Sequence, residues 1–164
     1  MRPSQLIYLI GPSGVGKTTC ALAAVAAFNA ELHKLDDLCR GRTSDWHFCK
    51  GVMLRIEASD ERHEHLNIID VGAGTQHDCN RELSDFLRIR RDQAILNWAS
   101  PAEVIKRNPL GPHRNPVEYL RTEYASREQL YSMPSHRLDI SGLSVSEAEE
   151  RFANYLLENS FANR

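Results

Sequence analysis

The sequence has no run of apolar residues long enough to cross a membrane, which takes about 20 of them. Its longest uninterrupted apolar run extends only from Cys20 to Phe28. The opening residues do not resemble a signal peptide either, because Met1–Gln5 leads directly into a strand-like run. We therefore expect a cytoplasmic protein with no membrane partner.

The sequence also lacks an excess of charge of one sign. Lys and Arg number 20 and Asp and Glu number 22, which gives a net charge of -2. A surface that binds nucleic acid needs a concentrated positive patch. The short basic cluster at 88–91 is not such a patch, because Glu82, Asp85 and Asp92 flank it. We expect no nucleic-acid partner.

Cysteine occurs only at positions 20, 39, 49 and 79, and no Cys-x-x-Cys pair is present. His47 and Cys49 are two residues apart, as are His77 and Cys79, but this spacing matches none of the familiar zinc patterns. The sequence therefore predicts reduced thiols and ordinary histidines, with no disulfide framework and no zinc site.

What the sequence does contain is an alternation of strand and helix patterns. A length of 164 residues and a hydrophobic fraction of 41% suit one domain that spans 1–164. Strands are expected at 6–10, 32–36, 66–71, 93–98 and 137–140. Helices are expected at 16–30, 46–59, 79–91, from 100 onward, at 117–131 and at 144–157, with a loop at 108–116. This alternation predicts an α/β fold with a mostly parallel sheet.

A glycine-rich segment separates the first expected strand from the first expected helix. Residues 11–18 read Gly-Pro-Ser-Gly-Val-Gly-Lys-Thr and fit G-x-x-x-x-G-K-[ST] at every fixed position. Such glycines let backbone N–H groups aim inward at a phosphate, and the following helix N-terminus favours an anion. Lys17 can reach the β- and γ-phosphates, while the Thr18 hydroxyl can ligate magnesium. The residues expected to bind the nucleotide are Gly11, Ser13, Gly14, Val15, Gly16, Lys17, Thr18 and Thr19.

Two missing motifs narrow the class of P-loop protein. The Asn-Lys-x-Asp guanine motif of GTPases is missing, and so is their Asp-x-x-Gly switch, because Ala73 stands three residues after Asp70. The chain is also short for a large motor ATPase. A loop between two helices near Arg107 suits a lid, which in a kinase excludes water from the transferring phosphoryl group. We therefore expect a small-molecule kinase that uses ATP and Mg²⁺.

The order of these motifs resembles the shikimate kinase family over most of the chain. The P-loop matches the nucleotide loop of that family, and residues 66–74 resemble its strand and triple-glycine turn. Residues 100–107 resemble the helix before its lid, and Arg-Glu-Gln-Leu-Tyr at 127–131 resembles its Arg-x-x-Leu-Tyr segment. The resemblance implies a P-loop kinase fold with a parallel sheet in the order 2-3-1-4-5, flanked by helices. It also implies an acceptor-binding region at about 37–65 and a lid at about 107–116.

The departures from the family pattern lie on the acceptor side. The Asp-x-Asp of the family stands here as Lys-Leu-Asp-Asp at 34–37, and its triple glycine stands as Gly-Ala-Gly at 72–74. Its Phe-Arg pair has no counterpart nearer than Arg55. Arg107 fits either the adenine-stacking arginine or the lid arginine, and Arg114 is a rival for the second role. The nucleotide side is intact, so we expect a relative whose acceptor can differ from shikimate.

Phosphoryl transfer depends more on positioning and charge neutralisation than on covalent help. Asp36 is expected to orient and deprotonate the acceptor hydroxyl, with Asp37 as the alternate choice. Asp70, at the end of an apolar strand, is expected to hold magnesium together with Thr18, directly or through water. The expected catalytic residues are Lys17, Asp36 and Arg107.

The acceptor is expected to be a small, hydroxylated and anionic molecule, with shikimate as the first guess. Arg127 can grip a carboxylate bidentately. The residues expected to bind the acceptor are Asp36, Asp37, Arg55, Gly72, Gly74 and Arg127. Two alternatives stay open: a monomeric kinase for another acceptor (a nucleoside, a sugar or an antibiotic), and a non-enzymatic nucleotide-binding protein. A monomer is expected in every case.

Overall fold

The computed structural model describes residues 5–60, 65–107 and 116–162. Five strands form one sheet in the order β2 (Ala30–Lys34), β3 (Leu66–Asp70), β1 (Leu6–Ile10), β4 (Ala94–Trp98) and β5 (His136–Asp139). Every neighbouring pair is parallel. The α/β fold and the strand order 2-3-1-4-5 are therefore confirmed.

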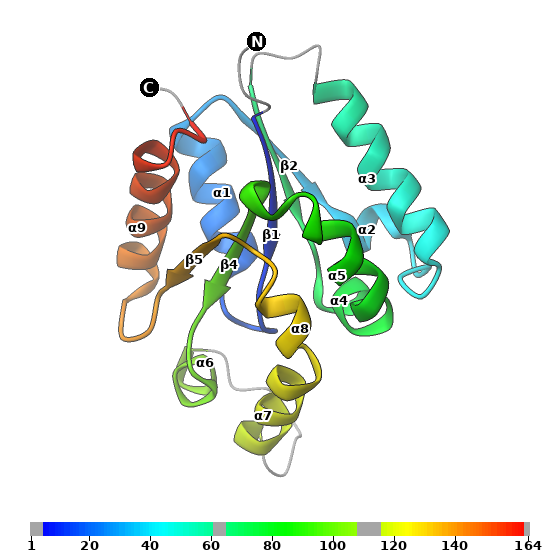
Figure 1. The fold of residues 1–164 in the computed structure, drawn as a ribbon. Coiled ribbons are helices and arrows are strands. Elements are labelled where there is room, and N and C mark those ends of the chain that lie inside the picture. Colours follow the sequence, from blue (N-terminus) through cyan, green and yellow to red (C-terminus); the bar gives the residue numbers. More distant parts are fainter. Residues whose placement is uncertain (1–4, 61–64, 108–115, 163–164) are drawn as a thin grey trace.

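Helices follow the strands in alternation and cover both faces of the sheet (Figure 1). They are α1 (Lys17–Ala27), α2 (Leu35–Cys39), α3 (Trp46–Asp60), α4 (Ala73–Asp78), α5 (Asn80–Arg88), α6 (Pro101–Arg107), α7 (Pro116–Ser126), α8 (Glu128–Tyr131) and α9 (Val145–Glu158), with a 3-10 turn η1 (Arg91–Gln93). None of the helices in the described parts of the chain is long and apolar enough to span a membrane.

The core has two layers, one on each face of the sheet. Successive strand side chains point to opposite faces. In β1, Leu6, Tyr8 and Ile10 accordingly join one hydrophobic cluster with α2, α3, α5 and α8, while Ile7 and Leu9 join another with α1, α6, α7 and α9. Because both faces are covered, β1 is buried at every residue, which explains its uninterrupted apolar sequence.

The structure corrects the predicted boundaries at three places that matter for the site. β2 ends at Lys34, in register with Asp70 of β3, so Asp36 lies in the short helix α2 and not in a strand. The helix expected at 79–91 is preceded by a further short helix, α4 (Ala73–Asp78), which begins within the expected glycine turn. The helix expected at 117–131 is divided at Arg127, whose φ of -111° and ψ of 14° depart from helical values.

A capping box closes the start of α9. The Ser144 Oγ accepts a hydrogen bond from the Glu147 backbone N–H (3.2 Å), and the Glu147 carboxylate accepts one from the Ser144 N–H (2.7 Å). At α6 the Ser100 Oγ accepts from the Glu103 N–H (3.3 Å), but the Glu103 carboxylate binds Lys106 and the Gly142 N–H instead of closing the box. The start of α9 lies near the nucleotide loop, because Val145 lines the same cavity as Gly14 and Lys17.

The chain places that loop at a switch point of the sheet. β2 and β3 lie on one side of β1, and β4 and β5 lie on the other. The carboxyl ends of parallel strands meet at one edge of a sheet, and ligands of open α/β sheets bind where the strand order reverses. The P-loop, which follows β1, occupies this position.

Candidate nucleotide and acceptor site

The P-loop wraps around the ammonium group of Lys17. Gly14 and Gly16 have φ of 73° and 96°, a region that favours glycine, and these two turns carry the backbone into α1. The Lys17 Nζ donates to the carbonyl oxygens of Gly11 (3.0 Å) and Pro12 (3.1 Å). The predicted strand–loop–helix arrangement is therefore present, with a cation inside the loop where a phosphate would sit.

Lys17 is 8% exposed, and its burial lowers the pKa of its ammonium group. The negative charge of Asp70 opposes this shift most, and Glu123 and Asp36 act in the same direction. The P-loop thus keeps a cation in a poorly hydrated place, where its attraction for phosphate is stronger than it would be in water.

Thr18 and Asp70 meet at the start of α1. The Thr18 Oγ1 donates to the Asp70 Oδ2 at 2.5 Å, and the Asp70 Oδ1 is buried without a hydrogen-bond partner. A hydroxyl oxygen beside a carboxylate with an unused oxygen is the type of ligand set that Mg²⁺ prefers. Within the described residues, no group of three or more His, Cys, Asp or Glu side chains could hold a metal.

A cavity of about 360 Å³ extends from the P-loop to the start of α9. Arg107, at the end of α6, lies in its wall and donates to the carbonyl oxygens of Ile140 and Leu143, the second at 2.6 Å. The rival lid arginine, Arg114, falls outside the described residues. The lining residues are Gly14, Val15, Gly16, Lys17, Thr18, Thr19, Cys20, Arg107, Ile140, Val145 and Ala148.

The structure separates the two candidate acids of α2. The Asp36 Oδ2 accepts from the Gly74 N–H (2.8 Å), and its Oδ1 accepts from the Thr75 N–H (3.1 Å) and the Thr75 Oγ1 (2.7 Å). These donors lie in the first turn of α4, whose N-terminus favours a carboxylate. Asp37, also in α2, is exposed. Asp36 is therefore the acid that the fold brings to the P-loop edge of the sheet.

The position of the Asp36 carboxylate explains why glycine occurs at positions 72 and 74. A Cβ atom on Gly72 would overlap the Asp36 carboxylate, and one on Gly74 would lie 2.9 Å from its Oδ2. The absence of side chains lets the carboxylate approach the backbone of the turn closely. Gly72 and Gly74 thus shape the site by admitting Asp36.

Arg127 is buried between α7 and α8 at 3% exposure. Its Nη1 donates to the Glu123 Oε1 at 2.9 Å and lies 3.4 Å from the Tyr131 hydroxyl, and its Nη2 lies 3.4 Å from the Ala73 carbonyl oxygen. Since Ala73 precedes Gly74, which binds Asp36, the guanidinium and the Asp36 carboxylate flank the same turn.

Arg55 does not join this group. It is exposed on α3, where it lines a separate depression with His33, Leu38, Val52, Ile56 and Ser59. Of the residues expected to bind the acceptor, the structure brings together Asp36, Gly72, Gly74 and Arg127, and it places Asp37 and Arg55 elsewhere.

Two buried polar residues of the site, Glu123 and Gln76, are not predicted from the sequence. Glu123 binds the P-loop residue Ser13 as well as Arg127, and its spacing of four residues from Arg127 on a helix was a usable signal. The Gln76 Oε1 accepts from the Gly11 N–H (3.3 Å), while its Nε2 donates to the Val71 carbonyl (2.6 Å). No local pattern marks Gln76, since its partners come from other elements.

These features define a P-loop nucleotide-binding fold. No protein-family model and no curated protein sequence matches the chain. Among solved structures, the shikimate kinase from Acinetobacter baumannii in complex with shikimate is similar, with a TM-score of 0.62, 19% identity and 96% of each chain covered. The shikimate kinase from Bacteroides thetaiotaomicron is similar with a TM-score of 0.66 and 15% identity, over 93% of this chain and 98% of that one. The chain therefore has the P-loop kinase fold seen in shikimate kinases.

The contact between Gly72 and Asp36 gives a testable consequence for stability. Gly72→Ala should displace the Asp36 carboxylate from α4 and lower the free energy of unfolding by about 1–3 kcal/mol. Gly51→Ala is the matched control, because Gly51 lies inside α3 and the nearest atom to its added Cβ is the Arg55 Nη1 at 3.7 Å. The control should raise stability by about 0.5–1 kcal/mol. Urea unfolding of both variants checks this, and equal shifts would contradict the contact.

Proposed function

We propose that this protein is an ATP-dependent kinase that transfers the γ-phosphate to a hydroxyl group of a small anionic molecule, with shikimate as the first candidate. The observation that carries the proposal is the buried Lys17 inside its glycine loop, beside the Thr18–Asp70 pair and on the same sheet edge as Asp36. These groups supply phosphate binding, a magnesium site and an acceptor acid within one fold.

The nucleotide is proposed to lie along the P-loop, with its phosphates on the backbone N–H groups and Lys17. The cavity toward α9 then receives the nucleoside, and Arg107 in its wall stacks against the base. Two bonds to backbone carbonyl oxygens hold this guanidinium in place, which suits a base-stacking role better than a role in a moving lid. The proposed lid at about 107–116 falls mostly outside the described residues.

Thr18 and Asp70 are proposed to hold magnesium through the Thr18 hydroxyl and the unpartnered Asp70 oxygen. Magnesium bound there would neutralise charge on the phosphates during transfer. Asp70 has a second effect of its own, since its negative charge keeps Lys17 more readily protonated despite burial.

Asp36 is proposed to orient the acceptor hydroxyl and to accept its proton. The acceptor oxygen bonds to the γ-phosphorus, the bond to the bridging oxygen breaks, and ADP leaves with the electron pair. The hydrogen bonds from Gly74 and Thr75 fix the carboxylate, so its position does not depend on a mobile side chain. Lys17 stabilises the charge on the phosphoryl group as it transfers.

The acceptor is proposed to bind between the region at about 37–65 and Arg127, whose buried guanidinium recognises a carboxylate. One observation favours a neutral acceptor as the second candidate. Arg127 is already paired with Glu123, and Arg55 lies apart from Asp36, so neither of the two arginines expected to bind a carboxylate is both close to Asp36 and without an acidic partner.

Lys17→Ala should keep the fold but slow phosphoryl transfer by on the order of a hundredfold or more, because a preorganised charge on the transferring group is lost. The measurement is ADP release in a coupled assay. Arg88→Ala, at an exposed position of α5 outside the P-loop and the proposed acceptor region, is the control and should retain wild-type turnover. Near-normal turnover of the Lys17 variant would refute the site.

Asp70→Asn should raise the magnesium concentration needed for half-maximal activity by on the order of tenfold, since a charged oxygen ligand is lost. A magnesium titration of turnover at saturating ATP measures this. Asp85→Asn serves as the control because Asp85 is exposed on α5, away from the P-loop. An unchanged titration for the Asp70 variant would remove Asp70 from the metal site.

The acceptor is tested by steady-state kinetics with shikimate and with neutral polyols, nucleosides and sugars. We expect turnover of shikimate or another carboxylated acceptor, and Arg127→Ala should raise the Michaelis constant for it by about tenfold or more. Arg121→Ala, which removes an exposed arginine from α7, should leave that constant unchanged.

Each outcome of this panel selects one function. Wild type that prefers a neutral acceptor supports the second candidate. An unchanged Michaelis constant in Arg127→Ala defeats the carboxylate grip. Nucleotide binding without turnover of any acceptor means that the protein is a nucleotide-binding protein and not a kinase.

A further inference from the structure

Glu123 of α7 joins parts of the molecule that bind different substrates in the proposed reaction. Its carboxylate is 5% exposed. The Oε1 accepts from the Ser13 N–H (2.9 Å) and from the Arg127 Nη1 (2.9 Å), and the Oε2 accepts from the Ser13 hydroxyl (3.2 Å). Ser13 belongs to the P-loop, and Arg127 flanks the turn that holds Asp36. One carboxylate therefore bonds to the nucleotide loop and to the acceptor arginine.

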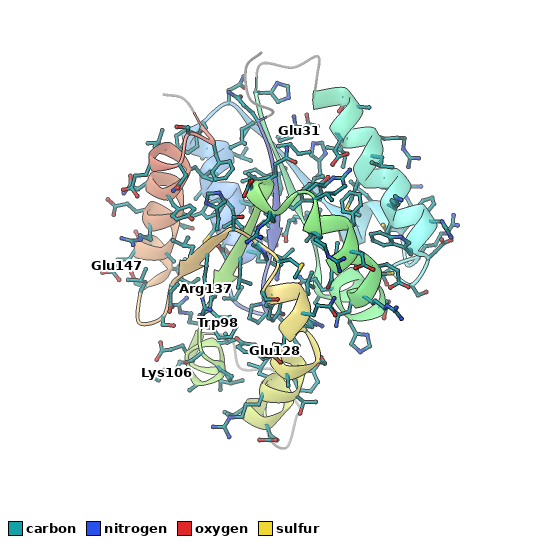
Figure 2. All side chains as sticks on the ribbon, viewed as in Figure 1. Glu31, Trp98, Lys106, Glu128, Arg137 and Glu147 are labelled. Carbon is teal, nitrogen blue, oxygen red and sulfur yellow. The ribbon has the colours of Figure 1, made fainter. Side chains whose placement is uncertain are left out.

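The helix that carries Glu123 is itself held firmly against the sheet. The hydroxyl of Tyr124 donates to the Ala99 carbonyl (2.6 Å), and its ring packs against Trp98 at the end of β4, with ring centroids 4.7 Å apart. Trp98 is covered in turn by the guanidinium of Arg137, 4.4 Å from the ring centroid (Figure 2). Glu123 is thus placed by a rigid support, which is the condition for a side chain that positions others.

The three nitrogen atoms of the Arg127 guanidinium differ in their hydrogen bonding. Its Nη1 faces Glu123 and Tyr131, its Nη2 makes only a long contact with Ala73, and its Nε is buried without a partner. Buried polar atoms without a partner are uncommon and call for an explanation. Nε and Nη2 form the edge of a guanidinium that binds a carboxylate side-on. Glu123 binds the opposite end of the guanidinium, at Nη1, so the ion pair does not use this buried edge.

We propose that Glu123 is a positioning residue that fixes the P-loop and Arg127 relative to each other, so that the nucleotide and the acceptor are held in one frame. This inference rests on the kinase function proposed above. In-line phosphoryl transfer depends on the relative placement of the two substrates, and a misplacement of about 1 Å can cost a hundredfold in rate. A carboxylate suits this role because every partner of Glu123 is a donor.

The negative charge of Glu123 also stabilises the positive charge of Lys17. Burial lowers the pKa of Lys17 most, and the positive charge of Arg127 lowers it further, while the charge of Glu123 raises it. The carboxylate therefore compensates a second cation close to Lys17, and both cations can stay charged in a buried place.

The test separates the bonds that Glu123 makes to Ser13 from its ion pair with Arg127. In Glu123→Gln the amide oxygen still accepts from the Ser13 N–H, and the amide NH₂ can donate to the Ser13 hydroxyl, so mainly the ion pair with Arg127 is lost. Glu123→Ala removes both. Arg127→Met and the double variant Glu123→Gln/Arg127→Met complete the set, and the double variant removes both buried charges together, which favours folding. Glu128→Gln, beside Arg127 in sequence but exposed on α8, is the matched control (Figure 2).

Glu123→Gln should lower kcat/KM for the acceptor by about tenfold and leave the dissociation constant of ADP within about twofold of wild type. Glu123→Ala should in addition weaken ADP binding by about fivefold, because the Ser13 N–H loses its acceptor. Adding Glu123→Gln to Arg127→Met should cause no further loss of kcat/KM, since the first residue acts through the second. Glu128→Gln should behave as wild type in both assays.

The proposal is overturned if Glu123→Gln leaves acceptor kinetics unchanged, or if its effect multiplies in full with that of Arg127→Met. It is also overturned if Glu123→Ala binds ADP as wild type does. A purely structural role would instead be shown if Glu123→Gln and Glu123→Ala both lowered the melting temperature and the number of ADP sites, with no difference between them in acceptor kinetics or in ADP affinity, and this too would overturn the proposal. Wild type that turns over no acceptor would end the proposed function alone. The ADP measurements would then still decide whether Glu123 positions the P-loop.

Discussion

A lysine ammonium group must remain charged in a place that water barely reaches, and the rest of the site is arranged around this requirement. Lys17 has carbonyl oxygens of the P-loop as direct partners, and the carboxylates of Asp70, Glu123 and Asp36 supply negative charge nearby. A buried charge without such compensation would lose its proton or its place. The P-loop therefore depends on acids from β3, α2 and α7, which are distant in the sequence.

This dependence explains which parts of the site could be predicted from the sequence. The strand, the loop and the helix from Leu6 to Ala27 are contiguous, and each has a local signal: a buried apolar run, fixed glycines and a helix former after them. The position of Asp70 could be predicted as well, because a polar residue that ends an apolar strand lies at the ligand edge of a parallel sheet.

The acceptor side was harder to predict because its contacts join residues that no sequence pattern links. Asp36 meets the backbone of Gly74 and Thr75, and Glu123 meets Ser13 across more than half of the chain. Arg55 is the nearest counterpart in the sequence to the Phe-Arg pair of the family, but its place on α3 puts it in a different depression. The fold class followed from alternating elements, whereas α2 and α4 are too short for a periodic signal to show.

The closeness of Asp36 to the turn at Gly72 also restricts the order in which substitutions can accumulate. While an aspartate occupies position 36, any side chain at 72 meets its carboxylate, so a change of this glycine displaces the acid from its place on α4. If position 36 changed first to a smaller residue, position 72 would become open to substitution, but the first turn of α4 would lose the carboxylate that caps it. A lineage that keeps the acid is therefore confined to glycine at 72, and one that abandons the acid must find another cap for α4 before the turn can diversify.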